Sequence, residues 1–486
     1  MLGSPVSAVR RAIPPLGLML AVLVAGVVLS PAIMWGYDSD IARQVAHSMV
    51  TERTFRVYND GLGINVPYAS YGIGLSLLMV IPELVGSPLG RSPLTLNTLI
   101  NPILLALIAL VIWVSARRCG VTTRQATVVS LCLALATPLL PYATTTFSEI
   151  GVSLGVAMGI LGILIAKDRG RVGGLIAGTG IGVAALMRPD SFLLVAPVVA
   201  IGAVMASRPQ WRTAMAGVAI AAMPAIAITA LYNMARFSSP LTSQYAGFDL
   251  SDSFVTPFWT GFYGLTASPG RGIILYAPIV LSVAIGMRWA WQRSPLLTTV
   301  CLALLVSRLL FYATWWSWAG GTGWGPRFLV PAMPALLPFV LEIVRRLEVK
   351  PRSTATATAS LAFAGLLVVS LGIQVVGAAT DVRGDGVIVE ALRRDALVPS
   401  GDLPFMTRAT TSPMLAATTD PFMDWSLFPI RENAQELLKG RTLMSRYLEP
   451  RVRTLPLTLA AVIFLVGLSA ALSKGNRPEE LSDGQT

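Results

Sequence analysis

Charged residues are scarce in this chain of 486 residues: Asp, Glu, Lys and Arg make up only 13% of it, and hydrophobic residues 54%. A soluble protein carries about 25% charged residues. Helices of a soluble protein would also need polar faces, and many stretches here contain no charged residue at all. Most of these stretches reach the roughly 17–25 residues that cross a bilayer. They lie at 12–37, 94–116, 125–148, 172–187, 191–207, 213–235, 272–287, 294–307, 353–380 and 454–473. The sequence therefore predicts an all-α polytopic membrane protein.

Histidine and cysteine are almost absent, which excludes several kinds of chemistry. The single histidine, His47, cannot build a His-based metal site, and nothing in the chain suggests a Ser-His-Asp triad around it. The three cysteines, Cys119, Cys132 and Cys301, lie in or beside apolar stretches without metal-ligand spacing, so neither a disulfide nor thiol chemistry is expected. The net charge of +12 comes from basic residues that flank the apolar stretches. It indicates membrane orientation, and no nucleic-acid partner is expected.

The apolar stretches predict a bundle of about twelve transmembrane helices. Arg10 and Arg11 precede the first, which has no clear cleavage site and is expected to be an uncleaved anchor. If the short stretch Tyr71–Gly86 crossed the membrane, all later loops would invert. If it lies at the interface or is re-entrant, most basic residues fall inside, as the positive-inside rule requires. We expect the second arrangement, with juxtamembrane helices in the first outer loop. The spans are then 14–34, 94–116, 125–141, 147–166, 171–187, 190–207, 212–232, 272–288, 295–313, 327–344, 354–378 and 455–473.

This topology puts both termini in the cytoplasm and every long connection outside a plasma or inner membrane. The long connections are 35–93, 233–271, 314–326 and 379–453. We expect a catalytic transmembrane module over 1–345 and a C-terminal part over 346–486 that carries a small extracytoplasmic segment, 379–453. Chemistry or recognition is therefore expected on the outer face, where there is no ATP.

Two aspartates open the first outer loop. Asp38 and Asp40 precede Ile41, Val45 and Met49, whose spacing of four predicts an amphipathic helix at the interface. Both acids suit the start of a helix, and for Asp40 capping and catalysis are equally open. A carboxylate at the edge of the hydrocarbon is costly and tends to be functional, so Asp38 is a candidate general base.

Glu149 is a second acid on the same side, after a run of three threonines at 144–146 and Ser148. It is a candidate catalytic residue, and the alternative is an acid in the first turn of a helix capped by Ser148. Carboxylates with hydroxyls nearby could also hold a divalent ion, Mg or Mn, for which Asp40 and Glu149 are the candidate ligands.

Arginines at the outer ends of spans oppose the inside bias of basic residues. Arg188, Arg271 and Arg327 are candidate binding residues, because a guanidinium binds phosphate through two bonds at once. Arg271 and Arg327 stand among glycines and prolines, which favours close backbone approach to a ligand. For Arg236, snorkelling to lipid head groups explains the position equally well.

Tryptophans crowd one outer loop beside several glycines. Trp316, Trp318 and Trp324 are candidate binding residues in a shaped cleft, because flat rings suit sugars and prenyl chains, although an aromatic belt at the interface could explain two of them. Arg308, inside the preceding span, is expected to pair with a buried carboxylate or to join the same site.

Together these stretches resemble the GT-C superfamily of integral-membrane glycosyltransferases, which use polyprenyl-phosphate sugars. The resemblance covers roughly residues 15–345 and is weaker after that. It is carried by the Asp38/Asp40 pair, Tyr68-Ala69-Ser70-Tyr71-Gly72, Arg188-Pro189, Ser268-Pro269-Gly270-Arg271-Gly272 with Tyr276-Ala277-Pro278, and Trp315-Trp316 followed by Gly320-Gly321 and Gly325-Pro326-Arg327-Phe328-Leu329.

The resemblance implies an extracytoplasmic active site with Asp38 as base or metal-linked carboxylate and Glu149 as a second acid. The reaction expected is transfer of a sugar, with inversion, from a polyprenyl-phosphate donor to a hydroxyl of a cell-envelope glycan, lipid or protein, as in cell-wall biogenesis. Tyr68 joins the expected binding residues. The alternative is a polytopic transporter or flippase of lipid-linked intermediates. Repeated halves and charges at mid-membrane would support it. The chain shows no repeat and, apart from Arg308, no such charge.

Overall fold

The computed structural model describes most of the chain up to Thr380 and short pieces beyond it. The described residues are 5–30, 37–58, 67–69, 71–86, 88–90, 92–241, 253–320, 323–347, 354–380, 421–423, 425, 428–439, 465 and 468–469. Most of the predicted outer segment 379–453 and of the predicted span 455–473 therefore lies outside the described residues.

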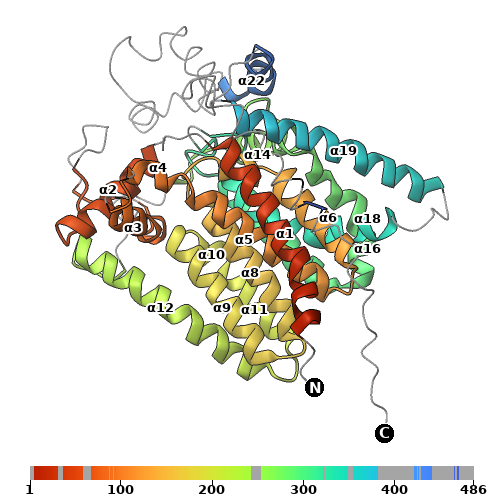
Figure 1. Ribbon diagram of the computed structural model, residues 1–486, viewed down its shortest axis with the longest axis horizontal. Helices are drawn as coiled ribbons and strands as arrows, with labels where there is room; N and C mark the ends of the chain where they lie inside the picture. Colours follow the sequence, from red (N-terminus) through yellow and green to blue (C-terminus); the bar gives the residue numbers. More distant parts are fainter. Residues whose placement is uncertain are drawn as a thin grey trace.

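The described residues form helices and no strand, which confirms the predicted fold class of an all-α polytopic membrane protein (Figure 1). An antiparallel bridge between Arg56 and Tyr68 is the single extended pairing among them. The helices are α1 Pro5–Leu29, α2 Tyr37–Thr51, α3 Gly74–Gly86, α4 Pro93–Asn97, α5 Ile100–Arg118, α6 Thr123–Leu135, α7 Leu139–Ala143, α8 Glu149–Ala166, α9 Gly170–Met187, α10 Ser191–Leu194, α11 Ala196–Ala206, α12 Trp211–Phe237, α14 Phe258–Thr266, α15 Ile273–Tyr276, η2 Pro278–Leu281, α16 Ser282–Arg293, α17 Pro295–Ala313, η3 Arg327–Leu336, α18 Leu337–Leu347, α19 Thr354–Ala379, η6 Pro421–Met423 and α22 Pro429–Leu438.

Seven helical segments among the described residues are long and apolar enough to cross a membrane. They are Pro93–Arg118, Glu149–Ala166, Gly170–Met187, Trp211–Phe237, Pro295–Ala313, Arg327–Leu347 and Ala357–Ala379. Shorter apolar helices cover Ile13–Leu29, Gly74–Gly86, Thr123–Leu135 and Ser191–Ala206. Each of the seven long segments corresponds to a predicted span, and so does each shorter one except Gly74–Gly86.

The predicted span 272–288 is not one continuous helix. It is divided into α15, η2 and α16, and the break falls at Ala277, which has an extended φ of −146° and ψ of 70°. Pro278 follows, and a proline disfavours the helical conformation of the residue before it. The span that starts at Arg327 also begins irregularly, as the 3-10 helix η3 with Pro331 and Pro334 inside it. Prolines thus shape two segments beside the outer loops.

The first outer loop contains two short helices, as predicted, and they lie together with α4 in Figure 1. In α2, Ile41 and Val45 are buried with Val57 and Ala69, and Met49 packs against them, which confirms the predicted amphipathic face. The apolar helix α3 has 13 residues. At 1.5 Å per residue it spans about 20 Å, and its interfacial position stays a prediction.

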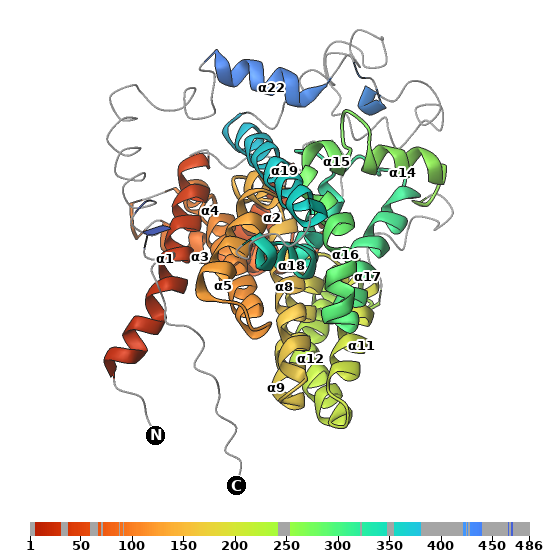
Figure 2. The same ribbon diagram turned by 90° about the vertical axis from the view of Figure 1, so that its right-hand side faces the viewer.

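Helices α8, α9 and α12 pack side by side through small residues (Figure 2). A Cβ added to Gly155 of α8 would lie 2.5 Å from the carbonyl oxygen of Gly180 in α9, and one on Gly174 of α9 would lie 2.1 Å from that of Ala214 in α12. Such close backbone approach is how helices associate in membranes. Gly155 lies six residues after Glu149, the first residue of α8, so this packing holds the helix that presents this acid.

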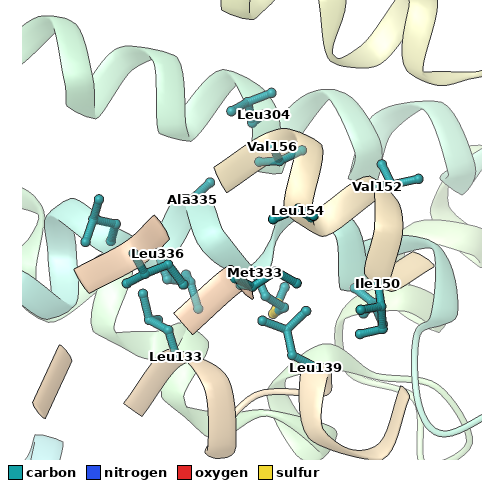
Figure 3. Packing of buried hydrophobic residues seen from close by; sticks show 14 of the residues in the cluster. Leu133, Leu139, Ile150, Val152, Leu154, Val156, Leu304, Met333, Ala335 and Leu336 are labelled. Carbon is teal, nitrogen blue, oxygen red and sulfur yellow. The ribbon is translucent and has the colours of Figure 1, made fainter. Parts of the chain in front are cut away.

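Figure 3 shows part of the larger hydrophobic cluster of the described residues. In it Leu133 of α6, Ile150 and Val156 of α8, Leu304 of α17 and Met333 of η3 are all buried. Ile150 follows Glu149 directly, so the core anchors the element that presents this acid. The later helix α19 bonds to this part of the chain, since Ser370 Oγ accepts from the backbone N–H of Ile279 at 2.7 Å.

Candidate active site

Asp38 lies in the first turn of α2 and is bonded to a residue far along the chain. Its Oδ1 accepts from the hydroxyl of Tyr71 at 2.6 Å, and its Oδ2 forms an ion pair with Nη2 of Arg327. The side chain is 16% exposed. The next residue fastens this turn, because Ser39 Oγ donates to the carbonyl oxygen of Thr146 at 2.9 Å. The predicted general base is thus held at the start of its helix by three other segments.

Glu149 is the first residue of α8 and is fully buried. Its Oε1 accepts from Nε of Arg327 at 2.6 Å and from Nη1 of Arg188 at 3.0 Å. Its Oε2 is buried and has no hydrogen-bond partner among the residues that the structure describes. The carboxylate therefore joins two arginines and keeps one oxygen unoccupied.

Arg327 connects the two acids. It starts η3, and its guanidinium bonds Glu149 through Nε and Asp38 through Nη2. The ring of Phe147 packs against it, with the guanidinium carbon 4.2 Å from the ring centroid. Two carboxylates and one aromatic ring thus hold the planar Arg327 guanidinium in place, and in this fixed position it is preorganised to receive an anion.

Besides Glu149, Arg188 bonds a second carboxylate, that of Asp190. Asp190 accepts from Nε of Arg188 at 3.1 Å, from the hydroxyl of Tyr312 at 2.5 Å and from Nη1 of Arg308 at 3.5 Å. Arg308 therefore has the buried carboxylate partner that the sequence suggested. Asp190 and Tyr312 were not identified from the sequence, nor was Tyr71 as a partner of Asp38. Asp190 was visible in the Arg188-Pro189-Asp190 motif, and Tyr312 stands one helical turn after Arg308.

The cluster consists of three carboxylates, of Asp38, Glu149 and Asp190, and three guanidinium groups, of Arg188, Arg308 and Arg327. Its formal charges therefore balance. Burial raises the pKa of Asp38, but the charge of Arg327 and the hydrogen bond from Tyr71 outweigh it and hold that pKa below its ordinary value. The carboxyl of Asp38 is therefore ionised at neutral pH. Buried ion pairs gain little stability after desolvation, so such a cluster is better explained by function.

Asp40 lies apart from the cluster. Its carboxylate is half-exposed and accepts from Nη2 of Arg43 at 3.0 Å and from Nε2 of Gln44 at 2.7 Å, both within α2. These contacts correspond to the alternative that Asp40 only stabilises its own helix. Of the two acids that the sequence left open, the geometry brings Asp38 into the cluster.

Arg271 is connected to Arg327 through neighbouring backbone carbonyls. Its Nε donates to the carbonyl oxygen of Ala319 at 2.9 Å, while Nη1 of Arg327 is 3.5 Å from the carbonyl oxygen of Gly320. Consecutive carbonyls thus hold the two arginines. Gly320 has a φ of +76°, a conformation that favours glycine. The ring of Phe422 covers the Arg271 guanidinium at 4.3 Å.

The aromatic candidates are placed differently from one another. Trp318 and Trp324 are buried, at 5% and 2% exposure, and their rings pack against Gly264 and Gly377. These two rings therefore lie in the interior of the bundle, and their part in a shaped cleft stays a prediction. Trp316 is partly exposed, and its backbone N–H donates to the carbonyl oxygen of Ser253 at 2.9 Å. Tyr68 is partly exposed and contacts Phe237, at the end of α12, edge to face.

The described residues do not fit a divalent metal. They contain no group of three or more His, Cys, Asp or Glu side chains that could hold an ion. The two candidate ligands are engaged elsewhere, Asp40 with Arg43 in its own helix and Glu149 with two arginines. We therefore assign no metal to Asp40 and Glu149 and derive no step through one.

No protein-family model matches the sequence, and no curated protein matches it. A solved structure similar to this chain is ArnT from Cupriavidus metallidurans bound to undecaprenyl phosphate, with 14% identity, 94% of this chain and 77% of that chain covered, and a TM-score of 0.47. Another is the Archaeoglobus fulgidus oligosaccharyltransferase in the apo form, with 13% identity, 87% of this chain and 63% of that chain covered, and a TM-score of 0.47. A structure of that oligosaccharyltransferase in complex with Zn and sulfate is also similar, at 14% identity, with 82% and 58% covered and a TM-score of 0.44.

One of these proteins is thus bound to undecaprenyl phosphate, and the other is an oligosaccharyltransferase. Their identities of 13–14% and TM-scores below 0.5 carry no weight for the chemistry of this chain. Its function has to be argued from the cluster of acids and arginines.

Proposed function

We propose that the protein is a membrane glycosyltransferase that moves a sugar from a polyprenyl-phosphate donor to an acceptor hydroxyl. The observation that carries the proposal is the buried chain of ion pairs from Asp38 through Arg327 and Glu149 to Arg188. It combines a carboxylate that is ionised at neutral pH with guanidinium groups suited to phosphate. These are the two functions that glycosyl transfer from a sugar phosphate requires.

In the proposed reaction, Asp38 takes the proton of the acceptor hydroxyl as the acceptor oxygen forms a bond to the anomeric carbon. The bond between this carbon and the phosphate oxygen breaks, and its electron pair stays on the phosphate. One displacement of this kind inverts the anomeric configuration. The products are the glycosylated acceptor and a polyprenyl phosphate with one more negative charge than it had in the donor.

Arg327 has two roles in this scheme. In the free protein its charge is shared between Asp38 and Glu149. A donor phosphate that binds to Arg327 competes with Asp38, and the exchange frees a carboxylate oxygen for the acceptor proton. Positive charge that is in place before the phosphate departs is where such an enzyme gains much of its rate. Arg188 and Arg271 are proposed to support the same phosphate.

The site is proposed to face the extracytoplasmic side of a plasma or inner membrane, with both termini in the cytoplasm. Glu149 and Arg327 stand at the starts of their helical segments, and basic residues stand at the other ends: Lys167 follows α8, and Arg345 and Arg346 lie near the end of the segment that Arg327 begins. The positive-inside rule places the basic ends in the cytoplasm. A lipid-linked donor suits the outer face, because the sugar phosphate carries its own activation. The acceptor is proposed to be a glycan, lipid or protein of the cell envelope.

The test is turnover of radiolabelled polyprenyl-phosphate sugars by the purified protein in detergent, wild type beside Asp38→Asn and Asp40→Asn. We expect one donor to be consumed, Asp38→Asn to lose about 100-fold or more of the rate, and Asp40→Asn to lose less than about three-fold. Glu52→Gln is a matched control, because Glu52 is exposed just after α2. Circular dichroism and size exclusion check that each variant is folded.

Two results would contradict the proposal. One is a wild-type protein that consumes no donor of the panel, which would favour a transporter or flippase of lipid-linked intermediates. The other is a folded Asp38→Asn variant as active as wild type. A loss in Asp40→Asn instead of Asp38→Asn would keep the glycosyltransferase function and move the base to Asp40.

A further inference from the structure

Asp190 gathers three donors from two other elements. Besides Arg188, two residues apart in the chain, it bonds Tyr312 and Arg308, both on α17. The side chains of Asp190 and Arg308 are 13% and 2% exposed. A buried carboxylate that satisfies two cations and a hydroxyl holds all three in fixed directions.

Arg188 is oriented by this group. Its Nε bonds Asp190 at 3.1 Å, its Nη2 donates to the hydroxyl of Tyr312 at 3.2 Å, and its Nη1 remains directed at Glu149 at 3.0 Å. The ring of Phe328 lies 5.1 Å from the guanidinium carbon. Asp190 and Tyr312 therefore fix Nε and Nη2 of Arg188. Its Nη1 faces Glu149, the acid that Arg188 shares with Arg327.

The partners of Asp190 also contact Phe328, the residue next to Arg327. Arg308 Nη1 donates to the carbonyl oxygen of Phe328 at 3.3 Å, and the ring of Tyr312 stacks on that of Phe328 at 4.1 Å and 7°. Phe328 follows Arg327 directly in the chain. Asp190 thus acts on one arginine through hydrogen bonds and on the other through the backbone beside it.

We propose that Asp190, with Tyr312, is a positioning residue that aims Arg188 at Glu149 and thereby keeps Arg327 directed at the departing phosphate. The inference rests on the proposed glycosyl transfer. Neither residue touches the reacting atoms in this scheme. Their effect is on the transition state, where the charge of the phosphate grows, so their loss lowers kcat more than it raises the donor KM.

The principal variant is Tyr312→Phe, which removes one hydroxyl and keeps the stacking on Phe328. We expect kcat per folded molecule to fall about ten-fold, as for one hydrogen bond to a charged group, with the donor KM changed less than about three-fold. In an Asp190→Asn background the same change should cost less than about two-fold more, because both act through Arg188. Tyr232→Phe, at a buried tyrosine of α12 that contacts Phe55 and Arg236, is the matched control and should keep the wild-type kcat.

A charge-balanced variant separates positioning from stability. Asp190→Asn leaves Arg188 and Arg308 with one carboxylate fewer, and we expect its thermal midpoint to fall. Asp190→Asn with Arg308→Gln restores the formal balance. The midpoint should recover by half or more, while kcat remains at least about ten-fold low because Arg188 is still not aimed.

Each other outcome overturns the inference in a distinguishable way. If the charge-balanced variant recovers kcat together with its midpoint, Asp190 only balances charge. If Tyr312→Phe keeps the wild-type kcat, the shared action through Arg188 is wrong. The same holds if its fall in kcat adds fully to the fall caused by Asp190→Asn. If the wild-type protein consumes no donor, the inference falls together with the proposed function.

Discussion

At the scale of single residues, the site depends on how one guanidinium is shared. Arg327 uses different nitrogens for Asp38 and Glu149, and Glu149 uses one oxygen for both Arg327 and Arg188. A lysine could not reproduce these contacts, because it offers a point charge without the planar fork. The ionisation of Asp38 follows directly from this arrangement, and it has a measurable consequence in the dependence on pH.

We expect catalysis to persist from pH 7 down to about pH 4, because a base works when deprotonated and the pKa of Asp38 lies below the ordinary carboxyl range. Tyr71→Phe removes a hydrogen bond to the charged form, so the pKa of Asp38 rises and the acid limb of kcat/KM moves to higher pH. Tyr58→Phe, at an exposed tyrosine of the same loop, should leave the limb in place. An acid limb of the wild type between pH 5 and 7 would argue against Asp38 as the base.

The stability contribution of this carboxyl has the same sign. Its pKa is lower in the folded protein than in the unfolded chain, where it is about 3.9. The ion pair with Arg327 therefore stabilises the fold at pH values above the unfolded pKa, and this contribution is lost as the pH falls through the folded pKa. Thermal midpoints recorded across the same pH range separate this loss from a loss of catalysis.

The sequence identified the residues whose charge is unexpected for their position. Asp38, Glu149, Arg188 and Arg327 each stand out at the edge of an apolar stretch, and the structure brings all four together. The hydroxyls of Tyr71 and Tyr312 could not be predicted, because a tyrosine near the membrane interface is common and its partner depends on tertiary packing. The choice between Asp38 and Asp40 also needed the direction of each side chain.

At the scale of elements, a loop between α7 and α8 connects α5 to the turn of α2 that contains Asp38. Nδ2 of Asn101, in α5, donates to the carbonyl oxygens of Tyr142, Thr145 and Phe147 at 3.2, 2.7 and 2.9 Å. The loop in turn accepts from Ser39 through Thr146. Asn101 thus holds the backbone against which Asp38 and the ring beneath Arg327 are placed.

This arrangement predicts opposite effects for two neighbouring asparagines. Asn101→Leu leaves buried carbonyls without a donor and should lower the free energy of unfolding by about 2–4 kcal/mol, with a fall in kcat as the loop shifts. Asn97→Leu should be neutral or stabilising, because both side-chain polar atoms of buried Asn97 lack a partner in the described part of the chain. The measurements are thermal midpoints and donor turnover of both variants. Equal destabilisation by the two changes would refute the role given to Asn101.

Helix existence was easier to predict than helix continuity. Apolar stretches such as 94–116 and 295–313 correspond closely to Pro93–Arg118 and Pro295–Ala313, since length and hydrophobicity alone define a helix in a bilayer. The stretch 272–288 is equally apolar but is broken at Ala277 and Pro278. Hydrophobicity does not report that break, whereas Pro278 in the sequence does.

At the scale of the whole molecule, the basic ends of several helices meet on the side opposite the cluster. Arg345, near the end of α18, donates to the carbonyl oxygen of Cys119, just after α5, and forms an ion pair with Glu342 at 2.5 Å. Arg118 lies 3.9 Å from Asp168, just after α8. Since Glu149 begins α8 and Arg327 begins the segment that ends with α18, the site and these basic residues are one helix length apart.

This polarity predicts the orientation of the chain in the membrane. A reporter fused after Arg118 should give a cytoplasmic signal, because the positive-inside rule retains the basic ends of the helices in the cytoplasm. A fusion after Phe237, the end of α12 beside the first outer loop, should give an extracytoplasmic signal. An outside signal after Arg118 together with an inside signal after Phe237 would reverse the topology. The cluster would then face the cytoplasm, and the argument for a lipid-linked donor on the outer face would fail even if the glycosyl transfer itself were confirmed.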